Sequence, residues 1–121
     1  MNSLIQHAKD TIDKHYDKSA HRVAAAIRTE LGQVFTSVSV QGQKMHLCSE
    51  WSAFVQALMS ESVIVEAVAV YRNPDGGYVI YPPCGLCREL YVTYCPEAKI
   101  ILGKDEVVSA KELLPKAWTR K

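Results

Sequence analysis

Hydrophobic and polar residues alternate along the chain with a period that changes from segment to segment. In residues 3–16 and again in 48–60, hydrophobic residues recur every three or four positions, which predicts two amphipathic helices. Residues 63–71 are an almost unbroken run of valine, alanine and other apolar residues, typical of a strand that is buried on both faces. We therefore expect this strand to lie at the centre of a sheet.

Other segments predict further strands and a third helix. Residues 22–28 and 34–40 flank the turn signal Leu31-Gly32 and predict a hairpin, although the alanines of the first segment leave its strand propensity ambiguous. Residues 78–81 are extended, and residues 84–94 predict a helix that ends before the next proline.

The last predicted strands are short and closely spaced. Residues 99–102 and 107–108 are separated by only four residues, whereas a parallel crossover needs about a dozen or more. We therefore expect these two strands to pair antiparallel, before a final turn or helix at 111–114. Strands and helices in this order predict an α/β fold, a mixed sheet with helices on its faces.

The length, composition and net charge of the chain indicate the number of domains and the kind of partner. The chain of 121 residues is long enough for a single domain, 1–121, and too short for a second. With 48% hydrophobic and 22% charged residues, it has the composition of a soluble globular protein. Its net charge of +1 gives no broad basic face, so we expect a small-molecule partner and neither a nucleic acid polymer nor a membrane.

The sequence also predicts a compartment. It has no apolar run long enough to cross a bilayer, and its start, Met1-Asn2-Ser3, lacks the hydrophobic segment of a secretory signal. We therefore expect a cytoplasmic protein. In that reducing compartment four cysteines, two of them in a Cys-x-x-Cys motif, favour metal binding over two disulfides.

Two short motifs, each at the predicted start of a helix, carry the candidate chemistry. Cys84 and Cys87 are three residues apart in a first helical turn, so their sulfurs can lie on one side of the helix, and Cys48 would supply a third thiolate. Zinc binds thiolates tetrahedrally, and three protein ligands leave its fourth position for water, as in catalytic zinc sites. Glu50 is placed to exchange protons with that water without binding the metal.

Two other interpretations of these cysteines have different requirements. A structural zinc ribbon needs a fourth closing ligand, and a redox Cys-x-x-Cys motif has no use for the segment that holds Cys48 and Glu50. His46 is an alternative ligand, although its position suits an ordinary surface or loop histidine better. Cys95 has no partner in the pattern, and we expect it to be a buried free thiol.

The order Cys-x-Glu followed by Pro-Cys-x-x-Cys, here Cys48-Ser49-Glu50 and residues 83–87, is the signature of zinc-dependent nucleobase deaminases. On these motifs and on residues 21–29 and 112–120, the chain resembles the cytidine deaminase superfamily, and within it the blasticidin-S deaminases. The resemblance implies a three-layer α/β/α sandwich with a five-stranded mixed sheet. It further implies one Zn²⁺ per subunit and a homotetramer with active sites at the subunit interfaces.

The resemblance also implies a reaction, the hydrolysis of a cytosine nucleoside to its uracil form with release of ammonia. Glu50 would take a proton from water and deliver protons to N3 of the base and to the leaving ammonia. Trp118 would stack on the substrate, often from another subunit, or pack on its own domain. His21 would line the base pocket or be an ordinary packed or surface histidine. The predicted substrate-binding residues are His21, Ser39, Gln41, Ser49, Pro83 and Trp118.

Two departures from the family concern the choice of substrate. Ser39 and Gln41 stand where the family has Asn and Glu, so an amide replaces the carboxylate that would hold a ribose hydroxyl; solvent-facing residues at a strand end are the alternative. Trp51 stands where many cytidine deaminases have an Arg that offsets the thiolate charge, and blasticidin-type enzymes can also lack that Arg.

These departures leave several functions open. The candidate substrates are an aminoacyl nucleoside antibiotic such as blasticidin S, which would make the protein an antibiotic-resistance enzyme, and plain cytidine or deoxycytidine. A non-catalytic, zinc-stabilised nucleoside-binding module is the alternative from a different class. The presence of Glu50 disfavours it, because a scaffold has no need for an acid beside an open zinc position.

Overall fold

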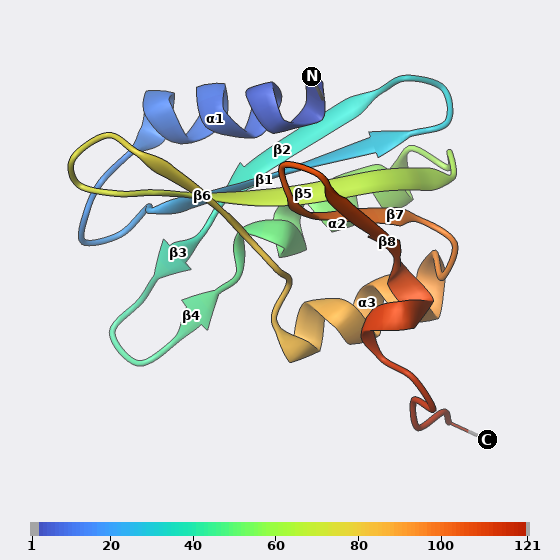
Figure 1. The fold of residues 1–121 in the computed structure, drawn as a ribbon. Coiled ribbons are helices and arrows are strands. Elements are labelled where there is room, and N and C mark those ends of the chain that lie inside the picture. Colours follow the sequence, from blue (N-terminus) through green and yellow to red (C-terminus); the bar gives the residue numbers. More distant parts are fainter. Residues whose placement is uncertain (1–2, 121) are drawn as a thin grey trace.

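The structure is a computed structural model that describes residues 3–120, so Met1 and Asn2 of the predicted start lie outside the described residues (Figure 1). Its main sheet has the strand order β2-β1-β5-β7-β8, and β6 pairs with β5 beside this path. The strands are β1 (Val23–Thr29), β2 (Val34–Val38), β5 (Ile64–Arg72), β6 (Tyr78–Tyr81), β7 (Lys99–Gly103) and β8 (Glu106–Ser109).

Both parallel and antiparallel pairs occur in this sheet. Strand β1 is antiparallel to β2 and β5, whereas β5 is parallel to β7, and β8 returns antiparallel to β7. The mixed sheet, the central place of the 63–71 strand and the antiparallel pairing of the last two strands are therefore confirmed. The turn of the first hairpin holds Gly32 at φ +86°, a left-handed conformation that glycine adopts without strain.

Helices cover both faces of the sheet. Helix α1 (Ser3–His15) packs on one face, while α2 (Ser49–Met59) and α3 (Gly85–Tyr94) lie on the other, and a short 3-10 helix, η1 (Ala110–Leu113), follows β8. The result is the three-layer α/β/α arrangement.

Neighbouring residues of one strand point into different layers, as the two-residue period of a strand requires. Ala26 packs in the cluster beneath α1, whereas Ile27 packs in the cluster beneath α2 and α3. Ile101 and Ile100 divide in the same way on β7. The alanines of β1, whose strand propensity was ambiguous, are fully buried because the helices approach the sheet closely on both sides.

The 34–40 segment differs from its prediction as one strand. Strand β2 ends at Val38, and the chain then leaves the sheet to form a small separate hairpin of β3 (Val40–Gln41) and β4 (His46–Leu47). The break falls at the buried Ser39, whose amide donates to the Val23 carbonyl (2.8 Å) and whose hydroxyl accepts from the Val23 amide (3.2 Å). A side chain that bonds the neighbouring backbone competes with the continuing ladder of strand hydrogen bonds.

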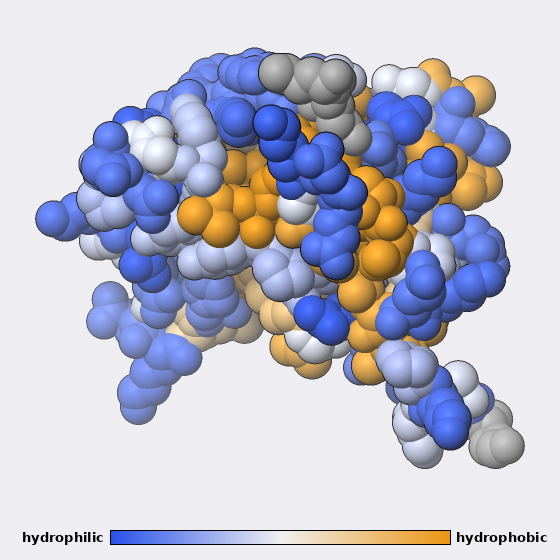
Figure 2. Space-filling model, viewed as in Figure 1, coloured by the Kyte–Doolittle hydropathy of each residue, from blue (hydrophilic) through white to orange (hydrophobic). Residues whose placement is uncertain are grey.

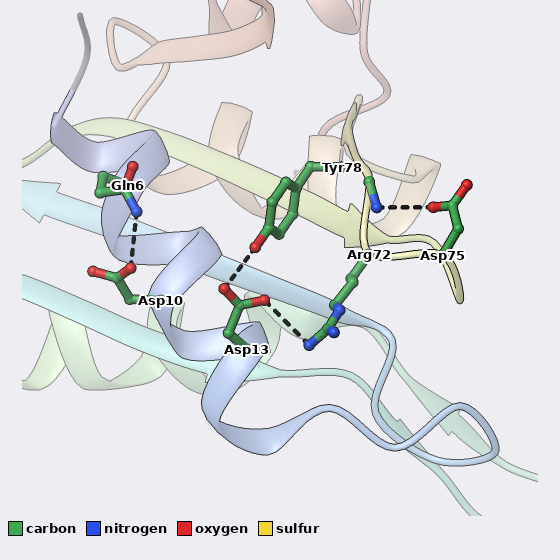
Figure 3. A network of polar contacts seen from close by, with 7 residues as sticks. Gln6, Asp10, Asp13, Arg72, Asp75 and Tyr78 are labelled. Atoms are coloured by element: carbon green, nitrogen blue, oxygen red, sulfur yellow. Dashed lines mark hydrogen bonds and ion pairs between the residues drawn. The ribbon is translucent and has the colours of Figure 1, made fainter.

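A polar network fastens α1 to the sheet (Figure 3). Asp13 of α1 accepts a hydrogen bond from the Tyr78 hydroxyl of β6 (2.6 Å) and pairs with Arg72 of β5 (3.3 Å). The Lys9 ammonium lies over the Tyr78 ring, 5.0 Å from its centroid. These contacts hold the β5–β6 hairpin against the helix.

Candidate metal and substrate site

The cysteines meet because two helices begin at the same place. Cys48 is the N-cap residue of α2 and Cys84 that of α3, each with an extended backbone and no side-chain capping bond. Their Sγ atoms are 3.2 Å apart. The two segments, 36 residues apart in sequence, thus present their sulfurs to one point.

Cys87, in the first turn of α3, completes a cluster of three thiols. It is buried, its Sγ lies 3.6 Å from that of Cys84, and the three sulfurs all lie within 4.8 Å of one another. In a regular tetrahedron of zinc–sulfur bonds about 2.3 Å long, the sulfurs lie about 3.8 Å apart. The three cysteines therefore fit the donor set and the spacing of a zinc site.

The thiols of the cluster ionise unequally. Burial, and then the hydrogen bond to Cys84, raises the pKa of Cys48 to about 11, and burial together with the charge of Glu50 raises the pKa of Cys87. Burial alone would also raise the pKa of Cys84, but the backbone N–H of Cys87 and the neighbouring sulfurs lower it on balance. Anionic sulfur at a helix start is the form that binds a metal ion.

Glu50 lies beside this cluster with its carboxyl group withdrawn from water. Its side chain is buried, and one carboxylate oxygen accepts a hydrogen bond from the Ser49 hydroxyl at 3.0 Å. Burial raises the pKa of the Glu50 carboxyl, and hydrogen bonds that include the Ser49 hydroxyl lower it by less. A carboxyl group in such surroundings is suited to proton transfer.

Ser37 of β2 ties the start of α2 to the sheet. Its hydroxyl donates to the carbonyl of Ser49 and accepts a hydrogen bond from the Ala53 amide at 2.9 Å. The Ser37 hydroxyl therefore joins a carbonyl and an amide of the first turn of α2, the turn that carries Glu50, to strand β2.

A cavity of about 180 Å³, here the inner cavity, opens beside the cluster. Its walls include Cys48, Ser49, Glu50, Cys84, Tyr81 and Ser39. A second cavity of about 260 Å³, the outer cavity, shares Val23, Ser39, His46 and Tyr81 with it and adds Arg22, Gln41 and Tyr71. The two cavities adjoin, so a molecule with two parts can occupy both.

Comparisons with known proteins agree with this geometry. No protein-family model matches the chain. Blasticidin-S deaminase from Bacillus cereus is 28% identical over 127 residues, which cover 97% of this chain and 91% of that protein. Cytidine deaminase from Halalkalibacterium halodurans is 30% identical over 108 residues, covering 84% of this chain and 80% of that protein. This chain belongs to the cytidine deaminase superfamily.

Solved structures from the superfamily share the fold. The cytidine deaminase from Bacillus anthracis superposes with a TM-score of 0.83 at 26% identity, over 96% of this chain and 87% of that one. The enzyme from Burkholderia pseudomallei gives a TM-score of 0.78 at 27% identity, over 98% and 100% of the two chains. The predicted resemblance is thereby confirmed, and with it the general class of deaminating hydrolase.

The predicted substrate residues fall at different places in this member of the superfamily. Ser39 lines both cavities and Gln41 the outer one, where its amide oxygen lies 3.0 Å from Nδ1 of His46. His46 also lines both cavities. It is not in the group of described residues whose side chains could together hold a metal ion. His21 is not among the described residues that line either cavity; its Nδ1 lies 2.9 Å from the Ser39 carbonyl oxygen.

The remaining predicted residues lie around or away from the cluster. Pro83 is buried, and its carbonyl accepts a hydrogen bond from Nε of Arg88 at 2.8 Å. Trp51 packs against the core beneath α2 and α3, and Cys95 is buried and free. Trp118 is 84% exposed and belongs to the segment that leaves the body of the protein after η1 (Figure 1).

The cavity residues that the sequence-based prediction did not include have among them a charged and two aromatic side chains, Arg22, Tyr71 and Tyr81. The rings of Tyr71 and Tyr81 stack at 5.1 Å between centroids, with an interplanar angle of 11°. Tyr81 stands only three residues before Cys84. That closeness was the available signal, but the pairing of β6 with β5 decides which way the ring faces.

Proposed function

We propose that this protein is a zinc-dependent hydrolytic deaminase of a cytosine nucleoside or of a cytosine-nucleoside antibiotic of the blasticidin S type. The observation that carries the proposal is the buried carboxylate of Glu50 beside three clustered thiols at the wall of a cavity. A structural metal site has no use for such a group. The product would be the uracil form of the substrate, together with ammonia.

Cys48, Cys84 and Cys87 would hold one zinc ion per chain. When bound, zinc supplies a Lewis acid that makes a water molecule nucleophilic near neutral pH. With three protein ligands, such an ion would keep a ligand position for water, and Cys48 and Cys84 belong to the wall of the inner cavity. The same thiols place negative charge at the site, which the N-termini of α2 and α3 partly offset.

Glu50 would move the protons of the reaction. Its carboxylate would take a proton from the attacking water and pass it to N3 of the cytosine ring. It would then take the proton of the hydroxyl group newly added to the ring and pass it to the amino group, which departs as ammonia. The Ser49 hydroxyl, 3.0 Å from one carboxylate oxygen, orients the group, and Ser37 fixes the helical turn on which it stands. Burial keeps competing water away from the carboxylate.

The cavities support a small substrate with a base and a second part. The inner cavity would take the cytosine ring, with Tyr81 against it and Ser49 at its edge, whereas Pro83 is not among the described residues that line this cavity. Ser39 and Gln41 would meet the sugar or its replacement in the outer cavity. The relatives act, by their names, on blasticidin S and on cytidine, and the amide of Gln41 favours a sugar other than plain ribose.

We also propose a homotetramer whose subunits complete one another's active sites. An apolar cavity of about 360 Å³ opens on the outside of α2 and α3, lined by Trp51, Val55, Leu58, Leu86 and Tyr94 among others. Hydrophobic residues also reach the surface over β6 and β8, where Val79 and Val107 are exposed (Figure 2). Such surfaces are typical of subunit contacts. Trp118, exposed on the projecting tail, would stack on the substrate of a neighbouring subunit.

The proposal places the enzyme in the cytoplasm, because four free thiols require a reducing compartment. Within residues 3–120, no helix has the length and apolarity that a membrane crossing requires.

The decisive experiment is an ammonia-release assay on the purified, zinc-analysed protein with cytidine, deoxycytidine, blasticidin S, cytosine and guanine. We expect turnover of at least one cytosine nucleoside, none of guanine, and one zinc per chain. Zinc binding without release of ammonia from any of these compounds would favour a nucleoside-binding module instead.

A further inference from the structure

The outer cavity contains a positive charge that nothing in it offsets. Among the described residues that line this cavity, Arg22 alone carries a formal charge at neutral pH. The rest of the wall is polar or aromatic and includes Ser19, Gln41 and Tyr71. A cavity of this kind attracts a negatively charged group.

The arginines within strands β1 and β5 have carboxylate partners. Arg28 of β1 pairs with Glu66 at 3.0 Å, and Arg72 of β5 pairs with Asp13 at 3.3 Å. Among the described residues, Arg22 has no ion pair. Its charge is therefore available to a ligand, which is not true of the other two.

The acid nearest to Arg22 in the sequence is already engaged. Asp17 lies in the loop between α1 and β1, and its carboxylate accepts hydrogen bonds from the amide (2.9 Å) and the hydroxyl (2.7 Å) of Ser19. The Asp17 carboxylate is thus hydrogen-bonded within its own loop and forms no ion pair with Arg22, which lines the cavity wall.

Hydrogen bonds to the sheet hold the backbone of Arg22 in place. Its carbonyl accepts a hydrogen bond from the Arg72 amide at 2.9 Å, and the next residue, Val23, opens β1 and is bonded to Ser39 on one side and paired with Tyr71 on the other. A charged residue on such a base loses less conformational freedom on binding than one on a mobile loop.

The outer cavity adjoins the inner one through Ser39, His46 and Tyr81. A nucleoside with its base in the inner cavity, beside Glu50, would extend its sugar end into the outer cavity, toward Arg22.

Building on the deaminase function proposed above, we propose that the preferred substrate is a cytosine nucleoside with an anionic group, a carboxylate or a phosphate, at its sugar end. Arg22 is the residue that selects it. The planar guanidinium matches two oxygens of either group, and such charge-assisted pairs are stronger than neutral hydrogen bonds. The substitution of an amide, Gln41, at the cavity wall leaves no carboxylate there to repel the anion.

The test compares three substrates that differ only at the sugar end: cytidine, cytidine 5′-carboxylate and cytidine 5′-monophosphate. We expect kcat/KM to be higher for one or both anionic substrates than for cytidine. The anionic substrate with the higher kcat/KM identifies whether the site prefers a carboxylate or a phosphate. Arg22→Gln should lower the ratio of kcat/KM for that anionic substrate over cytidine by about tenfold or more. Arg22→Lys should keep part of the ratio, and Lys18→Gln, which removes a charge from the same loop outside the cavity wall, should leave it unchanged.

A parallel binding measurement separates this inference from the deaminase function. The dissociation constants of uridine and its two anionic counterparts are measured by calorimetry on the same zinc-loaded proteins. An Arg22-dependent preference for the anion without any deamination would sustain the anion site and reject the proposed reaction. Deamination with equal kcat/KM for cytidine and both anions, or with a ratio that Arg22→Gln does not change, would overturn the anion site alone. Absence of both binding and turnover would overturn both.

Discussion

Two polar clusters in this protein join distant segments of the chain, one around Asp13 and one around Cys84. Around Asp13, the carboxylate accepts a hydrogen bond from the Tyr78 hydroxyl and pairs with the opposite charge of Arg72 (Figure 3). Around Cys84, three thiols face one another beside a buried carboxylate, and neither Lys nor Arg is among the described residues that line the adjoining cavity.

The difference fits a structural role for the first cluster and the proposed catalytic role for the second. The ion pair and the hydrogen bond of the first cluster stabilise the elements that they join without a bound ligand. Thiols bind a metal ion as thiolates, and a bound cation offsets the negative charge that they then carry. The buried carboxyl group of Glu50 lies beside the three thiols and has a hydrogen bond from Ser49 but no ion pair among the described residues. The cysteine cluster is therefore suited to binding a metal ion.

The largest expected effect is that of Glu50→Gln. If Glu50 transfers protons, kcat for ammonia release should fall by about 10²–10⁴-fold, the usual contribution of a positioned acid or base. Zinc content and the circular dichroism spectrum should be unchanged, because the amide is nearly the same size and is not a ligand. Glu106→Gln, at an exposed position on β8, is the matched control. Full activity of Glu50→Gln would remove the proposed mechanism.

The next largest effect is expected at Cys87, one of two buried cysteines, whereas replacement of the other, Cys95, should have a smaller effect. Cys87→Ser should lose zinc and, with it, the stability that zinc contributes, because a serine hydroxyl is a poor zinc ligand. Cys95→Ser places a hydroxyl at a position that is also buried and should cost about 1–3 kcal/mol of unfolding free energy without loss of zinc.

Metal analysis and thermal unfolding distinguish these two variants. Treatment with a chelator should lower the melting temperature of the wild type and leave that of Cys87→Ser unchanged. If the chelator has the same effect on both proteins, Cys87 is not a ligand.

A smaller effect is expected at the tail. Trp118→Ala should raise KM by about 2- to 12-fold, which corresponds to the loss of one aromatic contact. Thermal stability should not change, since the side chain is 84% exposed. Mixing Trp118→Ala chains with Glu50→Gln chains should restore part of the activity if the tryptophan acts on a neighbouring subunit. An unchanged KM would make Trp118 irrelevant to the site.

The smallest effect is expected in the polar network around Asp13. Asp13→Asn should lower the unfolding free energy by about 0.5–1 kcal/mol, because its partners are partly exposed and screened by solvent. Zinc content should not change. Asp10→Asn, on the same helix and bonded only to Gln6 among the described side chains, serves as the control in urea unfolding. A loss of zinc from Asp13→Asn would contradict the separation of the two clusters.

Local patterns were enough to predict most of the elements. The helices that follow Cys48 and Cys84, the buried 63–71 strand and the last hairpin all follow from periodicity and connection length, which depend on neighbours in sequence. The exception was the 34–40 segment. There Ser39 bonds to Val23 of another strand, a contact that periodicity does not encode.

The sequence by itself determined the chemistry available to this protein: three thiols, one acid and the order in which they occur. It could do so because each motif lies within a few residues and at a helix start, where local geometry orients the side chains. Only the tertiary structure decided that the two motifs meet, that Tyr81 and Ser39 join the two cavities, and that Arg22 stands at the end of the outer one. Those contacts depend on the pairing of β1 with β5 and of β5 with β6, and the register of distant strands is set by packing of the whole sheet.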